Sequence, residues 1–268
     1  MPEAANGDVT IFFEDQGAGT AVLLIHGHTM DRRIWNAMMP DLQDAGLRVI
    51  RPDLRGHGRS TRPDFGYHVS HHAADMVAVL DELELRRVVV VGYSIGGAVA
   101  LEMAVTMPDR LAGLVLVSPV MPDRPFEPEF MENLKQVARV ARSEGIVAAM
   151  TGPWAKNPLF EYSFTKPGIR DAAAAITEDF PGAEYLATQR DNVVRSWKVP
   201  DRLSEIDFPA TVVAGAEEMP GFIAFAEEAA AGIPGAALEL IDNCGHLVPL
   251  EEPERLAQMI VALANTTL

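Results

Sequence analysis

The sequence predicts an α/β protein with a mostly parallel sheet that is flanked by helices on both faces. Short apolar runs rich in valine, isoleucine and leucine recur along the chain, and amphipathic helical patterns separate them. Strands covered on both faces are apolar almost continuously, and strands that alternate with helices form parallel sheets. The length of 268 residues suits one large domain, or a core with an inserted subdomain.

Each expected strand is a short aliphatic run. The runs lie at residues 9–13, 21–25, 48–50, 88–91, 114–117, 211–214 and 238–241. Two helices between or after them carry apolar residues at i, i+3, i+4 and i+7. In the first helix these are Ala73, Met76, Val77 and Leu80, and in the last they are Leu256, Met259, Ile260 and Leu263. We assign Ser70 as the N-cap of the first helix and Pro253 to the first turn of the last.

The alternation of strands and helices stops between residue 118 and about residue 209. This stretch is rich in proline and shows helical patterns at 129–142 and 170–176, but no clear strand. Because a structureless loop of that length does not fit a compact domain, we expect a helical cap at 119–209, inserted into a core formed by 1–118 and 210–268.

Aromatic and sulfur-containing side chains in the expected cap offer the lining of an apolar pocket. They are Phe126, Phe130, Met131, Met150, Trp154, Phe160, Tyr162, Phe164, Tyr185 and Trp197. We assign Trp154, Phe160 and Tyr162 to the substrate pocket, together with Tyr93 from the core. The alternative for each of them is that it only packs the cap onto the core.

The charge and cysteine content narrow the class of protein. A net charge of −16 repels phosphate backbones and anionic lipid, so we expect neither a nucleic-acid partner nor a membrane partner. Cys244 is the sole cysteine, which excludes a disulfide within the chain and fits a reducing compartment. The first residues lack the features of a signal peptide, and no apolar run approaches the ~20 residues of a membrane-spanning helix. We therefore expect a soluble cytoplasmic protein.

The most informative segment is the expected strand at 88–91, which runs directly into Gly-x-Ser-x-Gly at residues 92–96 and then into a helical pattern. A tight strand-to-helix turn holds the Ser94 hydroxyl at the carboxyl edge of the sheet, and glycines leave room for the crossing backbone. The Ile95 N–H lies at a helix N-terminus, where it can stabilise a developing negative charge. The alternative is a glycine-rich connection with an idle serine.

A serine nucleophile needs a base, and His246 follows the last expected strand on a loop at the same sheet edge. A pair of Cys244 and His246 is a conceivable alternative, but Ser94 already has the favourable turn. The neighbouring His71 and His72 point in different directions from one helix, so we do not expect them to chelate a metal.

The chain resembles the α/β-hydrolase fold superfamily over essentially its whole length. The matching features are His26-Gly27 after a strand, the segment at 53–60, the turn at Ser94, a cap and Gly-His near the end. Within that superfamily the chain is similar to small serine esterases and enol-lactonases with an HGxx oxyanion loop. The resemblance implies that the segment at 53–60 only shapes the site.

The resemblance also implies a catalytic triad in the chain order serine, acid, histidine. The acid normally stands three residues after the glycine that ends the penultimate strand, a position that Glu218 occupies here in place of the commoner aspartate. Glu217 and Asp123 are the alternatives. The second oxyanion donor is the backbone N–H of His28, and His26 is expected to bond neighbouring backbone.

These features predict a serine hydrolase that cleaves carboxylic esters or lactones through an acyl-enzyme, with a small hydrophobic substrate and no metal or organic cofactor. A carbon–carbon bond hydrolase, a cofactor-free haloperoxidase and an aminopeptidase would also keep Ser94. A ligand-binding protein without activity is the alternative outside the enzymes. Haloalkane dehalogenases and epoxide hydrolases need an aspartate nucleophile, so Ser94 argues against both.

Overall fold

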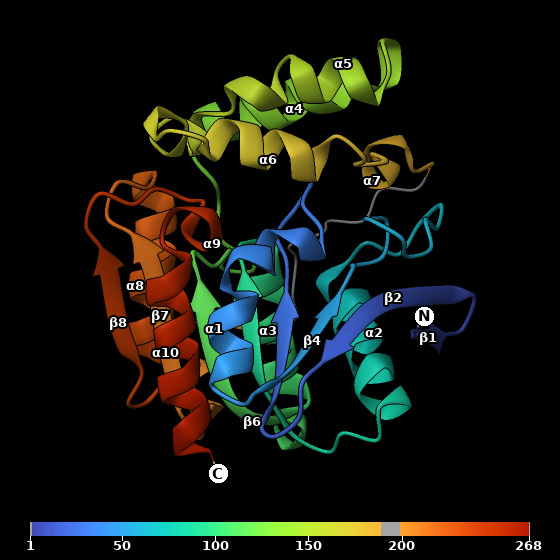
Figure 1. The fold of residues 1–268 in the computed structure, drawn as a ribbon. Helices are drawn as coiled ribbons and strands as arrows, with labels where there is room; N and C mark the ends of the chain where they lie inside the picture. Colours follow the sequence, from blue (N-terminus) through green and yellow to red (C-terminus); the bar gives the residue numbers. More distant parts are fainter. Residues whose placement is uncertain (1, 189–198, 268) are drawn as a thin grey trace.

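The computed structural model describes residues 2–188 and 199–267 and contains one eight-stranded sheet (Figure 1). The strand order is β1-β2-β4-β3-β5-β6-β7-β8. Both β1 and β2 pair in antiparallel fashion, whereas the six strands from β4 to β8 in this order are parallel, which confirms the predicted α/β class. The strands are β1 (Glu3–Asn6), β2 (Val9–Gln16), β3 (Ala21–Ile25), β4 (Arg48–Pro52), β5 (Val88–Tyr93), β6 (Leu111–Val117), β7 (Ala210–Gly215) and β8 (Ala237–Ile241).

Helices cover both faces of this sheet, with α1 and α10 packed together on one face and α2 and α3 packed together on the other (Figure 1). The α-helices are α1 (Met39–Asp44), α2 (Val69–Glu82), α3 (Ile95–Thr106), α4 (Pro128–Ser143), α5 (Ile146–Thr151), α6 (Ile169–Thr177), α7 (Ala183–Leu186), α8 (Pro220–Gly232), α9 (Val248–Glu251) and α10 (Pro253–Thr266). The 3-10 helices are η1 (Arg32–Met38), η2 (Pro108–Arg110), η3 (Trp154–Lys156), η4 (Pro158–Phe160), η5 (Ser163–Thr165) and η6 (Pro200–Glu205).

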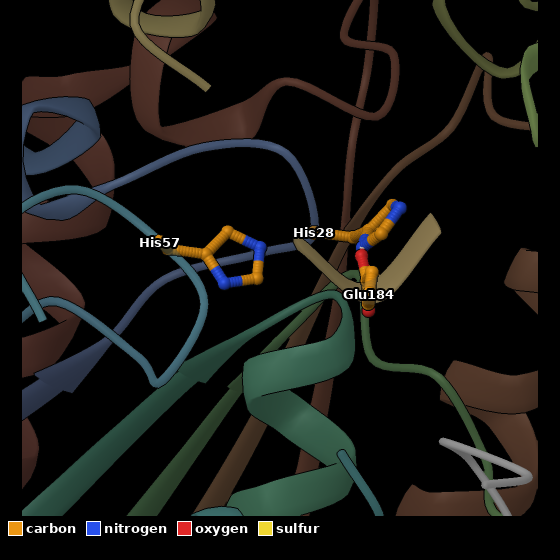
Figure 2. Close-up of side chains that lie close together, drawn as sticks. All are labelled: His28, His57 and Glu184. Carbon is orange, nitrogen blue, oxygen red and sulfur yellow. The ribbon is translucent and has the colours of Figure 1, made fainter. Parts of the chain in front are cut away.

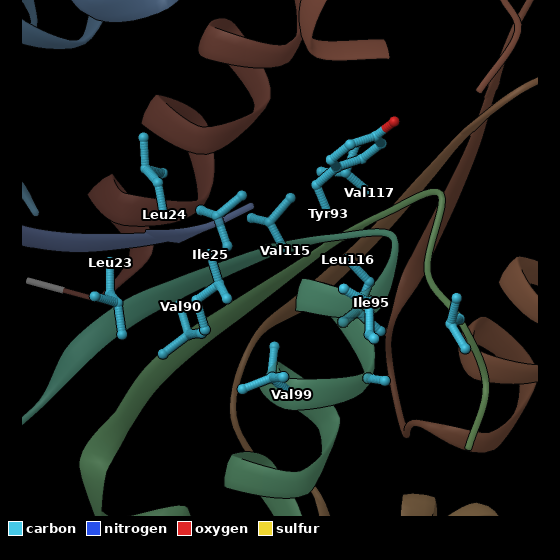
Figure 3. Close-up of a cluster of buried hydrophobic side chains, with 14 of the residues drawn as sticks. Leu23, Leu24, Ile25, Val90, Tyr93, Ile95, Val99, Val115, Leu116 and Val117 are labelled. Atoms are coloured by element: carbon cyan, nitrogen blue, oxygen red, sulfur yellow. The ribbon is translucent and has the colours of Figure 1, made fainter. Parts of the chain in front are cut away.

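The centre of the core lies between the middle strands and α3. Figure 3 shows side chains of β3, β5, β6 and α3 packed together, and Leu23, Val90, Val99 and Val115 are fully buried there. Since nearly every residue of α3 is buried, this helix has no polar face of the usual amphipathic kind. The apolar sequence of β5 and α3 therefore fixes the turn between them in the interior of the protein.

Two details differ from the sequence expectation. The edge strand β1, Glu3–Asn6, has no β-branched residue and was not predicted; it is a strand because it pairs with β2. Helix α2 starts at Val69, so the assignment of Ser70 as its N-cap is wrong. The N-cap is His68, whose Nδ1 accepts a hydrogen bond from the Ser70 N–H (3.2 Å). In contrast, Pro253 does occupy the first turn of α10.

Between β6 and β7, the described residues form α-helices and 3-10 helices and no strand. Helices α4, α5 and α6 lie beyond the carboxyl ends of the parallel strands (Figure 1). The division into a core and a cap at 119–209 stays a prediction, and Trp197 lies outside the described residues. In the described part of the chain, no helix combines the length and the apolar character needed to cross a membrane.

Candidate active site

Ser94 lies at the junction of β5 and α3 with a left-handed backbone conformation, φ 54° and ψ −117°. A residue other than glycine adopts such a conformation only where its surroundings hold it, and here both of its backbone polar groups are bonded. Its N–H donates to the Val117 carbonyl (2.9 Å), and its carbonyl accepts from the N–H groups of Gly97 (2.9 Å) and Val120 (3.0 Å). The strained turn that the sequence motif predicts is therefore present.

The hydroxyl of Ser94 donates to His246 Nε2 over 3.1 Å. The other ring nitrogen of His246, Nδ1, donates to Glu218 Oε1 in a short hydrogen bond. The loops after β7 and β8 meet to make this possible, since the N–H of Glu217 donates to the Cys244 carbonyl (2.9 Å). The three side chains are buried, and the hydrogen bonds run in the order serine, histidine, carboxylate.

Glu218 is the carboxylate that reaches His246, whereas Glu217 and Asp123 are exposed. The second oxygen of Glu218 accepts a hydrogen bond from the Ser118 hydroxyl (2.8 Å). This bond fixes the rotation of the carboxylate, so that Oε1 faces the imidazole. Ser118 follows β6 directly, and its importance could not be read from the sequence, because a lone serine after a strand carries no specific signal.

A second carboxylate, Glu251 of α9, holds the loop that carries His246. The N–H of Gly245 donates to Glu251 Oε2 (3.0 Å), and the N–H of Leu247 donates to Oε1 (3.1 Å). The Ser163 hydroxyl also donates to Oε1 (2.6 Å), and Lys166 Nζ lies 3.2 Å from Oε2. Sequence reasoning missed Glu251, although a carboxylate five residues after the histidine and just before the last helix is a signal that could have drawn attention to it.

Two backbone N–H groups are free to bind an anion near Ser94. Among the described residues, neither the N–H of His28 nor that of Ile95 donates a hydrogen bond. The loop that carries His28 approaches the serine closely, since a Cβ at Gly27 would lie 3.2 Å from Ser94 Cβ and 2.8 Å from the Tyr93 ring. The arrangement can therefore present two hydrogen-bond donors to an oxyanion.

Aromatic rings surround His246. The rings of Tyr93, Phe160 and Phe222 lie 5.2, 6.0 and 5.0 Å from its ring, measured between centroids. Trp154 packs on Phe160 at 5.1 Å. Sequence reasoning missed Phe222, which follows Glu218 by four residues and lies in the first turn of α8.

Three of the predicted pocket residues need qualification. Tyr93 is almost fully buried, and burial raises the pKa of its phenol, so this ring packs behind His246. The Trp154 indole N–H donates to the Thr29 hydroxyl (3.0 Å), which ties it to the loop of His28. Among the described residues, no ring contact or side-chain hydrogen bond joins Tyr162 to Ser94 or His246.

The polar side chains of the neighbouring loops form hydrogen bonds with backbone groups. The Leu54 N–H donates to His26 Nε2 (2.9 Å), and His26 Nδ1 donates to the Gly27 carbonyl (2.8 Å), which is the backbone bonding expected of it. Asp53 is buried and accepts from the N–H groups of Arg32 (3.0 Å) and Arg59 (2.9 Å). These bonds give the segment at 53–60 a shaping function.

The remaining candidates from the sequence do not form a site. Burial raises the pKa of the Cys244 thiol, so it stays protonated and is a poor nucleophile. His72 is buried and His71 is exposed, so the two rings lie in different surroundings. Burial, helped by the Arg55 charge, lowers the pKa of His72 to about 3.

A further group of polar side chains lies around the His28 ring. The His28 ring nitrogen Nε2 lies 2.7 Å from the Tyr185 hydroxyl, and Nδ1 lies 2.5 Å from Glu184 Oε1. Burial raises the pKa of Glu184 to about 8 and lowers that of His28 to about 4. Burial also lowers the pKa of His57 well below its usual range.

The family model and the similar proteins of known structure agree on one fold family. Residues 20–253 match the model of the α/β hydrolase fold. A thermophilic esterase from Thermogutta terrifontis is 31% identical, with a TM-score of 0.82 over 98% of this chain and 97% of that chain. Est816, an N-acyl homoserine lactone degrading enzyme, is also 31% identical, with a TM-score of 0.78 over 97% and 99% of the two chains.

A non-heme haloperoxidase from Rhodococcus erythropolis is 29% identical over 92% of this chain and 93% of its own length. The family model thus spans most of the chain, and the structural neighbours span nearly all of it. The eight-stranded sheet and the turn at Ser94 agree with this match. The chain belongs to the α/β hydrolase fold family.

Proposed function

We propose that this protein is a serine hydrolase that cleaves carboxylic esters or lactones through an acyl-enzyme. The observation that carries the proposal is the continuous hydrogen-bonded series from Ser94 Oγ through His246 to Glu218. A serine hydroxyl becomes a nucleophile only when a base removes its proton, and His246 Nε2 lies 3.1 Å from that oxygen. The esterase and the lactone-degrading enzyme at 31% identity support the same class of substrate.

In the acylation step, Ser94 Oγ attacks the carbonyl carbon while His246 Nε2 takes its proton. The carbonyl oxygen becomes an oxyanion and accepts hydrogen bonds from the N–H groups of His28 and Ile95. His246 then gives the proton to the leaving alcohol oxygen, and the carbon–oxygen bond breaks. Glu218 accepts the hydrogen bond from His246 Nδ1–H. This bond keeps Nε2 facing the serine, and the carboxylate charge stabilises the protonated ring.

In the second step, a water molecule gives a proton to His246 Nε2 and attacks the acyl carbon. The oxyanion forms again on the same two N–H groups, each of which is worth about 10²–10³ in rate in comparable sites. The proton then returns to Ser94 Oγ as the acid product leaves. In a lactone the alcohol stays attached to the acid, so the ring opens without loss of a fragment.

The side chains around Ser94 and His246 favour a small, largely hydrophobic substrate. Phe160 lies beside His246 and packs against Trp154, and both residues come from the segment at 119–209, which we propose forms a cap over the core. Apolar walls exclude water and strengthen the hydrogen bonds to the oxyanion.

A panel of short-chain esters and of lactones with different ring sizes tests the proposal. Wild-type protein should hydrolyse at least one member, and Ser94→Ala should lose more than 10³-fold in kcat while it keeps the wild-type melting temperature. Glu218→Gln should lose about 10²–10⁴-fold, because an amide cannot stabilise the protonated ring. If Glu218→Gln has normal turnover, the acid is another residue. Equal turnover by Ser94→Ala and the wild type refutes the proposal.

A second candidate is peroxide-dependent oxidation of halide, favoured by the similarity to the non-heme haloperoxidase at 29% identity. The same acyl-enzyme can be attacked by hydrogen peroxide in place of water, which yields a peracid that oxidises bromide. Bromination of a reporter dye in the presence of peroxide and a short carboxylic acid tests this candidate. A rate that is the same for the wild type and Ser94→Ala would exclude it.

A further inference from the structure

The loop of His28 brings together two imidazoles and a carboxylate that ester hydrolysis does not use. Figure 2 shows the side chains of His28, His57 and Glu184, which come from the loop after β3, the loop after β4 and helix α7. One ligating atom from each residue lies within 4.8 Å of the other two. Three segments that are far apart in the sequence thus present nitrogen and oxygen donors to one point.

Two atoms of this group are buried without a hydrogen-bond partner. His57 is 2% exposed, and neither its Nε2 nor Glu184 Oε1 has a partner within the described residues. Glu184 Oε1 approaches His28 Nδ1 but does not form a hydrogen bond with good geometry. Buried polar atoms of this kind point to a missing ligand, because native proteins satisfy nearly all of them.

In each imidazole, the ring nitrogen that faces away from the group has a partner of the kind that metal-bound histidines use. His57 Nδ1–H donates to the Arg55 carbonyl (3.0 Å), which leaves the lone pair of Nε2 facing the group. His28 Nε2 lies 2.7 Å from the Tyr185 hydroxyl, which leaves Nδ1 facing Glu184. Histidine ligands commonly donate their second N–H to a carbonyl or another oxygen in this way.

The charge and the distances also fit a cation. In the part of the chain that the structure describes, no arginine or lysine forms an ion pair with Glu184. Zinc binds nitrogen and oxygen ligands at about 2.0–2.2 Å, so the ligand atoms of a tetrahedral site lie about 3.4 Å apart. The three ligand atoms lie within 4.8 Å of one another, and His28 Nδ1 lies 2.5 Å from Glu184 Oε1, so side-chain rotations that even out these separations would complete the site.

We propose that His28, His57 and Glu184 bind one divalent transition-metal ion of the zinc type. Two imidazoles and one carboxylate form the ligand set of many zinc sites, with a fourth position left for water. The ion joins helix α7 to the loops after β3 and β4, so its binding stabilises the folded protein. The proposal does not depend on ester hydrolysis, because none of its evidence involves Ser94 or His246.

Cobalt is the probe for this site, because bound Co²⁺ absorbs visible light and zinc does not. Protein without a polyhistidine tag is freed of metal with a chelator, dialysed and titrated with Co²⁺, and then with Zn²⁺ as competitor. The wild type should bind one Co²⁺ per chain, release it to Zn²⁺ and melt at a higher temperature with Zn²⁺ present. A wild type with no saturable absorbance and no thermal shift overturns the proposal.

Matched variants locate the site. Glu184→Gln and His57→Asn should each weaken Co²⁺ binding by at least tenfold, and their own melting temperatures without metal show whether they fold. Glu178→Gln and His71→Gln alter an exposed acid and an exposed histidine outside the proposed ligand set and should bind like the wild type. His246→Gln should also keep Co²⁺, since its partner Glu218 belongs to the other site. Normal affinity in folded Glu184→Gln and His57→Asn overturns the proposal.

Discussion

The carboxylate of Glu251 binds both N–H groups that flank His246, and this one side chain ties the proposed base to the segment between β6 and β7. Its partners Ser163 and Lys166 come from that segment, and its own side chain is fully buried. If this carboxylate moves, the loop that it holds moves with it and displaces the imidazole relative to Ser94. We therefore regard Glu251 as a positioning residue that acts through His246.

Replacing Glu251 with glutamine should lower kcat for ester hydrolysis about 10–100-fold, because a small misplacement of a proton-transfer group is costly. The amide can accept only one of the two backbone hydrogen bonds, and it loses the charge that pairs with Lys166. KM should change less than kcat, since the substrate pocket is intact. Steady-state kinetics measure both. The control is Glu252→Gln, which also lies near Lys166 (3.6 Å). Equal kcat in the two variants contradicts the assigned role.

The side chains at the centre of the site differ in how far the sequence predicts them. Ser94 and His246 follow from their positions after strands, and the structure brings both together with Glu218. Ser118 and Glu251 contact this group from positions with no specific motif, so their contacts depend on tertiary structure. A pattern in one sequence shows which residue types are available, and the packing of distant segments decides which of them meet.

The turn between β5 and α3 depends on close contact of two backbones. A Cβ at Gly96 would lie 2.2 Å from the Ile25 carbonyl oxygen, which belongs to the neighbouring strand β3. Because the obstacle is backbone in the centre of the sheet, it cannot turn aside as a flexible side chain would. The glycine therefore sets the distance between α3 and the sheet.

Gly96→Ala should destabilise the protein by about 3 kcal/mol or more, since overpacking in a rigid core typically costs 1–3 kcal/mol. Urea unfolding followed by circular dichroism measures the change. The control is Gly235→Ala, where φ is +75° but no atom lies within 4 Å of the new Cβ, so only backbone strain is added. If Gly96→Ala is no less stable than Gly235→Ala, the close contact does not exist in solution.

Helices and strands with strong patterns could be predicted from the sequence, and the weaker ones could not. The parallel strands β3 to β8 are aliphatic runs, and helices α4 and α6 match the patterns at 129–142 and 170–176. The strand β1 has the sequence EAAN and forms only because β2 offers it an edge. The N-cap of α2 is His68, and because histidine has little capping preference the sequence favours Ser70 instead.

The folded protein buries several histidines, which makes its stability depend on pH. Burial lowers the pKa of His26 and His57, and it lowers that of His72 to about 3. Unfolded, each of these rings has its ordinary pKa of about 6.5. Below that pH the unfolded chain therefore takes up protons that the folded chain does not, and stability falls as the pH falls.

His72→Leu should make this dependence shallower by about 1.4 kcal/mol per pH unit below about pH 6, the contribution of one proton. The effect continues down to the folded pKa of about 3. Unfolding free energies of the wild type and the variant between pH 6.5 and 4.5 measure it, and carboxylates that titrate in both proteins cancel in the comparison. Parallel curves would mean that His72 is protonated in the folded protein.

The distribution of charge and histidine over the chain could be read from the sequence, but the meeting of His28, His57 and Glu184 could not. They are separated by 29 and 127 positions in the sequence, and no spacing rule links them. Their proximity results from the sheet, which aligns the loops after β3 and β4, and from the placement of α7 beside those loops. Sites assembled in this way become visible only in three dimensions.

The reaction of the protein with a fluorophosphonate tests the proposed nucleophile most directly. Intact-mass measurement and peptide mapping should find one phosphonylated residue, Ser94, in the wild type. No adduct should form in Ser94→Ala, and His246→Gln should react at least 10²-fold more slowly, because the hydroxyl then lacks its base. An adduct on another residue, or labelling of Ser94→Ala at the wild-type rate, would contradict the proposal that Ser94 is the nucleophile of a hydrolase.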